Sequence, residues 1–161
     1  MITKINALDD ALRPDSGQIV TWDEKLSTGI ELIDSQHKEL VELTNKLYQS
    51  CLSGHDDAVF KEAMGRMVNY VKFHFGAEQQ LLERIHYPAY PDHKRQHDTL
   101  VKEILDAVKA AGEGKSFVAN NFVRTLKEWI FGHIAFTDRQ YALYVTEQKR
   151  KGLLTDAQIN G

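Results

Sequence analysis

The sequence predicts an all-α protein, folded as an up-down-up-down four-helix bundle with short N- and C-terminal extensions. Its 161 residues, 42% of them hydrophobic, suit one domain with a single core. Only three prolines occur, Pro14, Pro88 and Pro91, so two long stretches contain no helix breaker. Hydrophobic residues in both stretches recur every three or four positions, and the alternation typical of β-strands is absent.

The first predicted helix begins near Ile30 and ends near Gly54, where small and polar residues follow. Its hydrophobic positions repeat with the period of an α-helix. They are Ile30, Ile33, Leu40, Leu43, Leu47 and Cys51. The second predicted helix begins near Asp57, a residue type that caps helices, and ends before Tyr87-Pro88. Its hydrophobic positions are Phe60, Met64, Met67, Val71, Leu81 and Ile85.

The third predicted helix follows the two prolines and ends at Gly112-Glu113-Gly114. Its hydrophobic positions are Leu100, Ile104, Ala107, Val108 and Ala111. The fourth begins near Ser116, a candidate N-cap, and ends after Val145. Its hydrophobic positions are Phe122, Leu126, Trp129, Ile130, Ile134, Tyr141 and Val145. Short loops between consecutive helices favour antiparallel neighbours, and hence an up-down-up-down bundle. We expect this bundle to span residues 20–148, with an N-terminal extension (1–19) and a C-terminal tail (149–161).

Polar residues interrupt the hydrophobic face of every predicted helix. They are His37 in the first helix, His74 and Glu78 in the second, His93 and His97 in the third, and His133 in the fourth. A single core histidine usually bonds to a backbone carbonyl, but one core cannot satisfy six such groups in that way. A buried carboxylate also needs a cation or a proton. The pattern therefore predicts a metal site inside the bundle.

Asp138 is a further candidate donor, although it lies five residues after His133. In a regular α-helix this spacing separates the two side chains by about 140°. The inward hydrophobic pattern also shifts by one residue at this point, as though a residue had been inserted. We therefore expect a local widening of the helix, such as a π-bulge, that turns both side chains inward.

Imidazole and carboxylate donors without thiolate suit iron, zinc, copper or manganese. Seven donors are too many for one ion. Five imidazoles, two bridging carboxylates and a bridging oxide or hydroxide would fill all but one of the positions of two octahedral ions. The vacant position would accept a small ligand. Cys51, the only cysteine, excludes an internal disulfide and is expected to be a small core residue.

These residues occur in motifs that resemble those of the hemerythrins, particularly bacteriohemerythrin-like proteins, over roughly residues 20–145. The motifs are Trp22-Asp23-Glu24, Gly29-Ile30, Ile33-Asp34-Ser35-Gln36-His37, His74-Phe75-Gly76-Ala77-Glu78, Tyr87-Pro88, His93-x3-His97 and His133-x4-Asp138-x2-Tyr141. The resemblance implies two non-haem iron ions joined by an oxo or hydroxo bridge. By that resemblance, His93, His97 and His133 hold the coordinatively full iron.

The resemblance further implies that His37 and His74 hold the open iron and that Glu78 and Asp138 bridge the two. The implied function is reversible dioxygen binding for carriage, storage or local supply, without enzymatic activity. One alternative is an O2 or redox sensor that acts through a partner protein. Another is a di-iron oxidoreductase that reduces peroxide or oxidises iron. Because oxidising di-iron sites draw on more carboxylates than the two present here, we favour carriage.

Hydrophobic residues one helical turn from a donor are candidates to line a dry pocket for the gas. They are Ile33, Val71, Leu81, Leu100, Trp129 and Ile130. Gln79 stands where many hemerythrins carry a second acid, which changes the surroundings of the metal but removes no ligand. His55 and His86 are expected outside the site, and Glu83-x-x-His86 is expected to be a chance match to a di-iron motif.

Charge and hydropathy argue against several partners. The formal net charge of −3 leaves no basic excess for nucleic acid. No hydrophobic run approaches the length of a membrane span, and Met1 to Asp10 do not resemble a signal peptide, so we expect a cytoplasmic protein. In the N-terminal extension, an amphipathic helix with Ile2, Ile5, Leu8 and Leu12 is a candidate surface for self-association or a protein partner.

Overall fold

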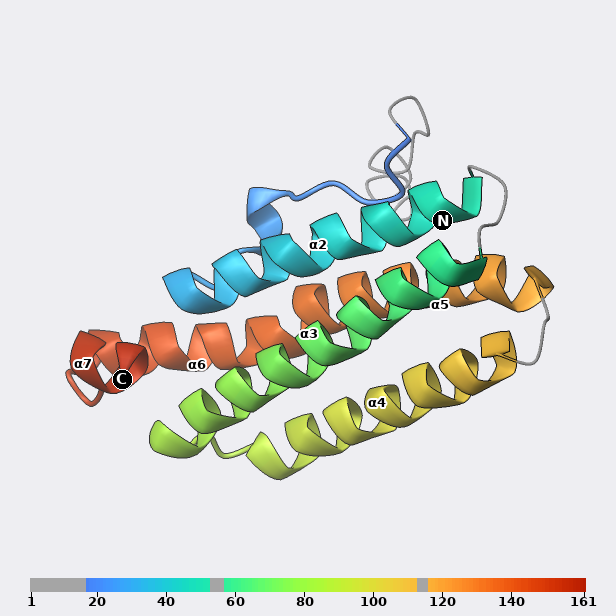
Figure 1. Ribbon diagram of the computed structural model, residues 1–161. Coiled ribbons are helices and arrows are strands. Elements are labelled where there is room, and N and C mark those ends of the chain that lie inside the picture. Colours follow the sequence, from blue (N-terminus) through green and yellow to red (C-terminus); the bar gives the residue numbers. More distant parts are fainter. Residues whose placement is uncertain (1–16, 53–56, 113–115) are drawn as a thin grey trace, which may run out of the picture.

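The computed structural model describes residues 17–52, 57–112 and 116–161 and confirms the all-α bundle. Consecutive long helices run in opposite directions, as the colours of Figure 1 show. The first three are α2 (Glu31–Leu52), α3 (Asp57–Arg84) and α4 (Tyr90–Gly112). The fourth is composite and consists of α5 (Ser116–Gly132), the π-helical turn η3 (His133–Asp138) and α6 (Arg139–Arg150). Two short helices complete the described chain, the 3-10 turn η2 (Glu24–Leu26) and α7 (Asp156–Asn160).

The start of α2 is stabilised by the Asp34 side chain. Its carboxylate accepts hydrogen bonds from the backbone N–H of Thr28 at 2.7 Å and from the hydroxyls of Thr28 and Ser27 at 2.8 and 2.5 Å. Gly29, at φ 74°, has the left-handed backbone that lets the chain turn into the helix. The helix that carries His37 therefore begins at a defined residue.

The connection between α3 and α4 is short and sharply turned. His86 has a left-handed φ of 53°, and Tyr87 donates its backbone N–H back to the Leu82 carbonyl at 2.9 Å. Helix α4 starts at Tyr90, so Pro91 occupies its first turn, where the missing N–H has no helical partner to lose. This connection sets the end of α3 beside the start of α4, the segments that carry Glu78 and His93.

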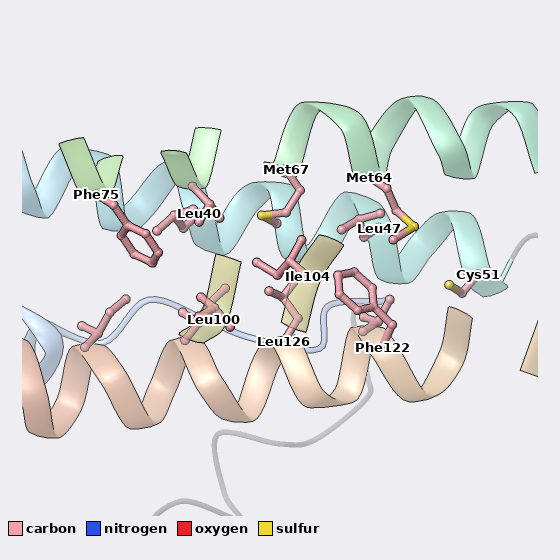
Figure 2. Packing of buried hydrophobic residues seen from close by; sticks show 14 of the residues in the cluster. Leu40, Leu47, Cys51, Met64, Met67, Phe75, Leu100, Ile104, Phe122 and Leu126 are labelled. Atoms are coloured by element: carbon pink, nitrogen blue, oxygen red, sulfur yellow. The ribbon is translucent and has the colours of Figure 1, made fainter. Parts of the chain in front are cut away.

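Most of the interior is a hydrophobic cluster contributed by all four long helices. Figure 2 shows its packing, in which Leu47, Met67, Leu100 and Leu126 are at most 2% exposed. Cys51 lies in the same cluster, as expected, and burial raises the pKa of its thiol. This part of the core holds the four helices at the separations that the polar site needs.

A second hydrophobic cluster fills the end of the bundle where α2 begins and α3 ends. Its buried members are Ile30, Ile33, Leu81, Leu82, Ile85, Tyr141, Val145 and Ile159. Ile159 belongs to α7, so the segment predicted as a C-terminal tail is folded and packs against the bundle. The predicted N-terminal helix with Ile2, Ile5, Leu8 and Leu12, and the loop residue His55, lie outside the described residues.

The chain that precedes α2 is attached to the bundle by Asn45. The side chain of Asn45 accepts hydrogen bonds from the backbone N–H groups of Ile19 and Val20 and donates one to the Val20 carbonyl. In the described part of the chain, no helix combines the length and the apolar character that crossing a membrane requires.

Candidate metal centre

The structure brings all seven predicted donors together inside the bundle, and none is more than 5% exposed. Their potential ligand atoms form two groups, and the atoms within each group lie within 4.8 Å of one another. The five-donor group consists of Glu78, His93, His97, His133 and Asp138. The four-donor group consists of His37, His74, Glu78 and Asp138. Both carboxylates belong to both groups, so the arrangement suits two neighbouring ions that share two ligands.

The π-helical turn η3 explains how His133 and Asp138 both face inward. It spans His133–Asp138 and contains both candidate donors. A π-turn bonds each carbonyl to the N–H five residues on, so side chains five positions apart lie on the same face. The widening predicted from the shifted hydrophobic pattern is therefore confirmed. A π-turn contains one residue more than an α-helical turn, and here the solvent-facing side of the helix accommodates it, where Phe136 is 67% exposed.

Deleting Phe136 should convert η3 into a regular helical turn. We expect the metal-free protein to become more stable, by about 1 kcal/mol, because an irregular turn is removed. Metal binding should weaken, because the loss of one residue displaces His133 or Asp138 along the helix axis by about 1.5 Å, far more than metal–ligand distances tolerate. Chelator competition on the deletion variant measures this. Phe136→Ala, which keeps the residue count, is the control, and unchanged affinity in the deletion variant would contradict the explanation.

Three imidazoles in the five-donor group point their Nε2 atoms at the two carboxylates. Glu78 Oε2 lies 3.1 Å from Nε2 of His97 and 3.3 Å from Nε2 of His93. Asp138 Oδ1 lies 2.9 Å from Nε2 of His133 and 3.4 Å from Nε2 of His93. The Nε2 atoms of His97 and His133 are only 3.0 Å apart. Imidazole nitrogens and carboxylate oxygens therefore converge on one point in the core, where a bound cation would stabilise them.

The four-donor group contains the same two carboxylates, and Glu78 faces it with the oxygen, Oε2, that also faces the five-donor group. Asp138 Oδ2 faces Nε2 of His37 at 3.2 Å, while its Oδ1 faces the five-donor group. Nε2 of His74 lies 3.8 Å from Glu78 Oε2. Asp138 therefore offers one oxygen to each group, which suits a bridging ligand. This group contains two imidazoles where the other contains three.

Unpaired polar atoms in the four-donor group show that the site suits an ion. Both ring nitrogens of His37 and both carboxylate oxygens of Asp138 are buried without a hydrogen-bond partner. The 3.2 Å contact between His37 and Asp138 lacks the alignment of a hydrogen bond. Leaving such groups unpaired in a core costs several kcal/mol. An ion ligated by imidazole and carboxylate would satisfy them, so the residues fit a transition-metal centre.

Side chains around the donors hold the imidazoles in place through their outward nitrogens. Nδ1 of His74 lies 2.9 Å from Oε1 of the buried Gln36. Nδ1 of His97 lies 3.3 Å from the amide nitrogen of Gln79. The Gln36 oxygen accepts the Nδ1–H of His74 and so orients that imidazole with Nε2 toward the metal. The sequence drew attention to Gln79 but not to a role for Gln36. The feature that could have indicated it is an uncharged polar residue next to His37 on the inner face of the helix.

Aromatic rings lie against two of the imidazoles. The ring of Phe75 stacks on that of His97, with centroids 3.6 Å apart and planes 5° apart. Trp129 stacks on His133 at 4.9 Å and 17°. Of the expected pocket residues, Trp129 is half-buried and the other five are buried, namely Ile33, Val71, Leu81, Leu100 and Ile130. Their contact with a bound gas remains a prediction.

Tyr141 is a further site residue, whose role sequence reasoning did not identify. Its hydroxyl donates a hydrogen bond to Glu78 Oε1, and the whole side chain is buried. Burial, and then the charges of Glu78 and Asp138, raise the pKa of Tyr141 well above its usual range. The phenol therefore stays protonated and orients the Glu78 carboxylate. Its spacing from Asp138 placed it on the inner face but did not reveal this contact.

The charges of the metal-free site are set by burial and by mutual contacts. Burial lowers the pKa of His74 to about 4, although Glu78 opposes that shift. Burial alone would raise the pKa of Glu78, but its contacts with His74, His93 and His97 outweigh burial and hold the pKa well below its usual range. For His133, Asp138 outweighs burial and raises the pKa. His74 is therefore a neutral imidazole at neutral pH, the form that binds a metal.

The lowered pKa of His74 predicts acid sensitivity in the metal-free protein. The unfolded chain takes up this proton near pH 6.5, whereas the folded chain resists it until about pH 4. Stability is therefore lost as the pH falls between these values, by about 2 kcal/mol at pH 4.5. Urea unfolding of the metal-free protein at pH 7 and pH 4.5 measures the loss. His74→Leu should show a smaller loss, and an equal loss in both proteins would assign the effect to other groups.

The two remaining features that sequence reasoning set aside lie apart from the centre. His86 is exposed, and Glu83 accepts a hydrogen bond from the Tyr90 hydroxyl at 3.0 Å. Neither residue belongs to either donor group found in the described part of the chain. The Glu83-x-x-His86 match therefore contributes no donor to the centre.

The amino-acid sequence is similar to a known protein family and to several of its members. A family model described as the hemerythrin HHE cation binding domain matches residues 28–144. A bacteriohemerythrin of Stenotrophomonas maltophilia (strain R551-3) is 31% identical over 124 residues, which cover 77% of this chain and 80% of that protein. A bacteriohemerythrin of Pseudomonas aeruginosa (strain LESB58) is 30% identical over 122 residues, which cover 76% and 78%.

The fold agrees with the sequence comparison. The crystal structure of a wild-type hemerythrin superposes with a TM-score of 0.72 at 26% identity, covering 77% of this chain and 95% of the other. A mutant hemerythrin gives a TM-score of 0.73 with 78% and 95% coverage. The uncovered part of this chain exceeds a fifth of its length.

Proposed function

The chain belongs to the hemerythrin HHE cation-binding family, and from this premise we propose that it holds two iron ions and binds dioxygen reversibly. The proposed role is carriage, storage or local supply of oxygen, without catalytic turnover. The observation that carries the proposal is the inequality of the two donor groups. They share both carboxylates, but one adds three imidazoles and the other only two. Two like ions held by these groups would differ by one ligand.

We assign His93, His97 and His133 to the fully ligated iron and His37 and His74 to the iron with the vacant position. Glu78 and Asp138 would bridge the two, with an oxo or hydroxo group as the third bridge. When bound, the reduced iron pair supplies the electrons for reversible dioxygen binding. The protein contributes fixed ligands, because Gln36 orients His74 and Tyr141 orients Glu78.

The surrounding hydrophobic residues support binding over oxidation. Ile33, Leu81 and Ile130 are each at most 3% exposed and lie about one helical turn from His37, Glu78 and His133. A dry site withholds the water and protons that promote loss of the bound gas as an oxidised product. The buried single cysteine is compatible with a reducing compartment, and we place the protein in the cytoplasm.

Oxygen titration after anaerobic reduction tests the proposal. We expect two irons per chain and an absorption band that appears with O2 and disappears when O2 is removed. His74→Ala should lose the gas-dependent band, because the open iron loses one of its two imidazoles. His86→Ala, at an exposed histidine outside the centre, should behave as wild type. One zinc per chain, or prompt irreversible oxidation without an oxygenated spectrum, would contradict the proposal.

The same samples separate the alternatives. Sustained consumption of peroxide or of ferrous iron, beyond the two irons bound, would make the protein an oxidoreductase. A surface change on oxygenation, detected as altered hydrogen exchange far from the donors, would favour a sensor that acts through a partner. For an oxygen carrier we expect neither.

A further inference from the structure

The end of the bundle near the metal centre is covered by the C-terminal segment, residues 151–161, which lies outside the family match at residues 28–144. We propose that this segment is a hydrophobic cap that keeps water away from the carboxylate side of the centre. The expected effect of the cap on the lifetime of the oxygenated protein rests on the proposed function. Its expected effect on the access of water to the metal-free core does not.

The segment has its own local structure. Gly152, at φ 72°, reverses the chain after α6. Thr155 and Gln158 then form a capping box, in which each side chain bonds to the other residue's backbone N–H, at 2.9 and 3.3 Å. Asp156 adds an ion pair with Lys149 of α6 at 2.5 Å. These contacts position so short a helix, which backbone bonding alone would not hold.

Arg84, the last residue of α3, fastens the segment to the bundle. Its guanidinium donates hydrogen bonds to the backbone carbonyls of Gln158 at 2.6 Å and Ile159 at 2.9 Å. These carbonyls end α7 and have no helical partner, so Arg84 serves as their cap. The docking therefore joins the C-terminus to the helix that carries Glu78.

Ile159 provides the hydrophobic contact of the cap. It is 7% exposed and belongs to the cluster that contains Ile33, Leu82 and Tyr141. A surface hollow beside α7 is lined by Ile30, Val145 and Ile159 among others. Without Ile159, this hollow would open further onto Ile30 and Val145, which line it and are at most 5% exposed. Ile159 is thus the outermost layer of the cluster at this end.

The inner members of the same cluster adjoin the donors. Ile33 precedes His37 by one helical turn, and Leu82 and Tyr141 follow Glu78 and Asp138 by one turn. Water admitted here would reach the Tyr141 hydroxyl first and compete for its hydrogen bond to Glu78. The cap therefore protects the contact that orients a shared carboxylate.

Hydrogen exchange on the full-length protein tests the cap. In metal-free Ile159→Asp, we expect backbone amides of residues 30–33, 81–85 and 141–145 to exchange at least about 10-fold faster than in wild type, with the far end of the bundle unchanged. Leu153→Asp is the matched control, because Leu153 lies in the same segment but is 65% exposed. Arg84→Gln, which alters no hydrophobic contact, should give a smaller acceleration in the same residues.

In the iron-loaded protein, Ile159→Asp should shorten the lifetime of the oxygenated form several-fold, while O2 saturation immediately after mixing stays as in wild type. Equal exchange in Ile159→Asp and wild type, or equal acceleration in Leu153→Asp, would overturn the cap. If Ile159→Asp fails to fold, Arg84→Gln decides: exchange in residues 30–33, 81–85 and 141–145 that equals wild type would overturn the cap. Failure of the proposed oxygen binding would remove only the lifetime measurement and leave the exchange measurement to judge the cap.

Discussion

Glu78→Gln is expected to lose both metal ions, because Glu78 belongs to both donor groups. The substitution keeps the size of the side chain and an oxygen that can accept the Tyr141 hydrogen bond, so the fold should persist. It removes the negative charge and the second oxygen ligand. Since even the outer partners of metal ligands are worth about 10- to 100-fold in affinity, the loss should exceed about 100-fold for each ion. Iron analysis and competition with a chelator measure it.

The matched control is Glu83→Gln, which changes an exposed carboxylate five residues further along the sequence, outside both donor groups. It should retain full iron content. Asp138→Asn should reproduce the defect of Glu78→Gln, because Asp138 is also shared by the two groups. A Glu78→Gln protein that retains one tightly bound iron would show that Glu78 serves only one ion.

Removing the metal from the wild-type protein should lower its thermal stability strongly. Without an ion, His37 and Asp138 retain buried unpaired atoms, and five imidazoles crowd two carboxylates. A ligand present at about 1,000 times its dissociation constant stabilises the folded state by about 4 kcal/mol. For a protein of this size we therefore expect the melting temperature to fall by about 10 °C or more.

Differential scanning calorimetry of the chelated and iron-loaded protein measures this difference, and adding ferrous iron back under anaerobic conditions should restore the higher value. In the Glu78→Gln protein, chelation should change the melting temperature little, because little metal is bound to begin with. Equal melting temperatures for loaded and chelated wild type would mean that the site contributes nothing to folding stability.

The inward positions of the donors followed from periodicity alone. Because hydrophobic residues on a helix face the core every three or four positions, a histidine at the same spacing must face it too, as His37, His74 and His97 do. Even the π-turn at His133–Asp138 was predictable, because the hydrophobic pattern shifts by one residue there. Helix ends were marked by proline, glycine and capping residues.

Contacts between helices were beyond the reach of periodicity. Gln36 meets His74 from another helix, and Tyr141 meets Glu78 across 63 positions of sequence. Such pairs depend on how the helices rotate and slide against each other, which the whole core decides through close packing.

The sequence by itself determined four helices and the seven donors on their inner faces, because both follow from local spacing along one chain. The family resemblance implied that the imidazoles divide into three and two around shared carboxylates, and the tertiary structure brings the donors into those two groups. Tertiary structure alone decided that Ile159 and Arg84 hold the C-terminal segment against the nearby end of the bundle. These features depend on distances between helices, and those distances are set by the packing of side chains that lie far apart in the sequence.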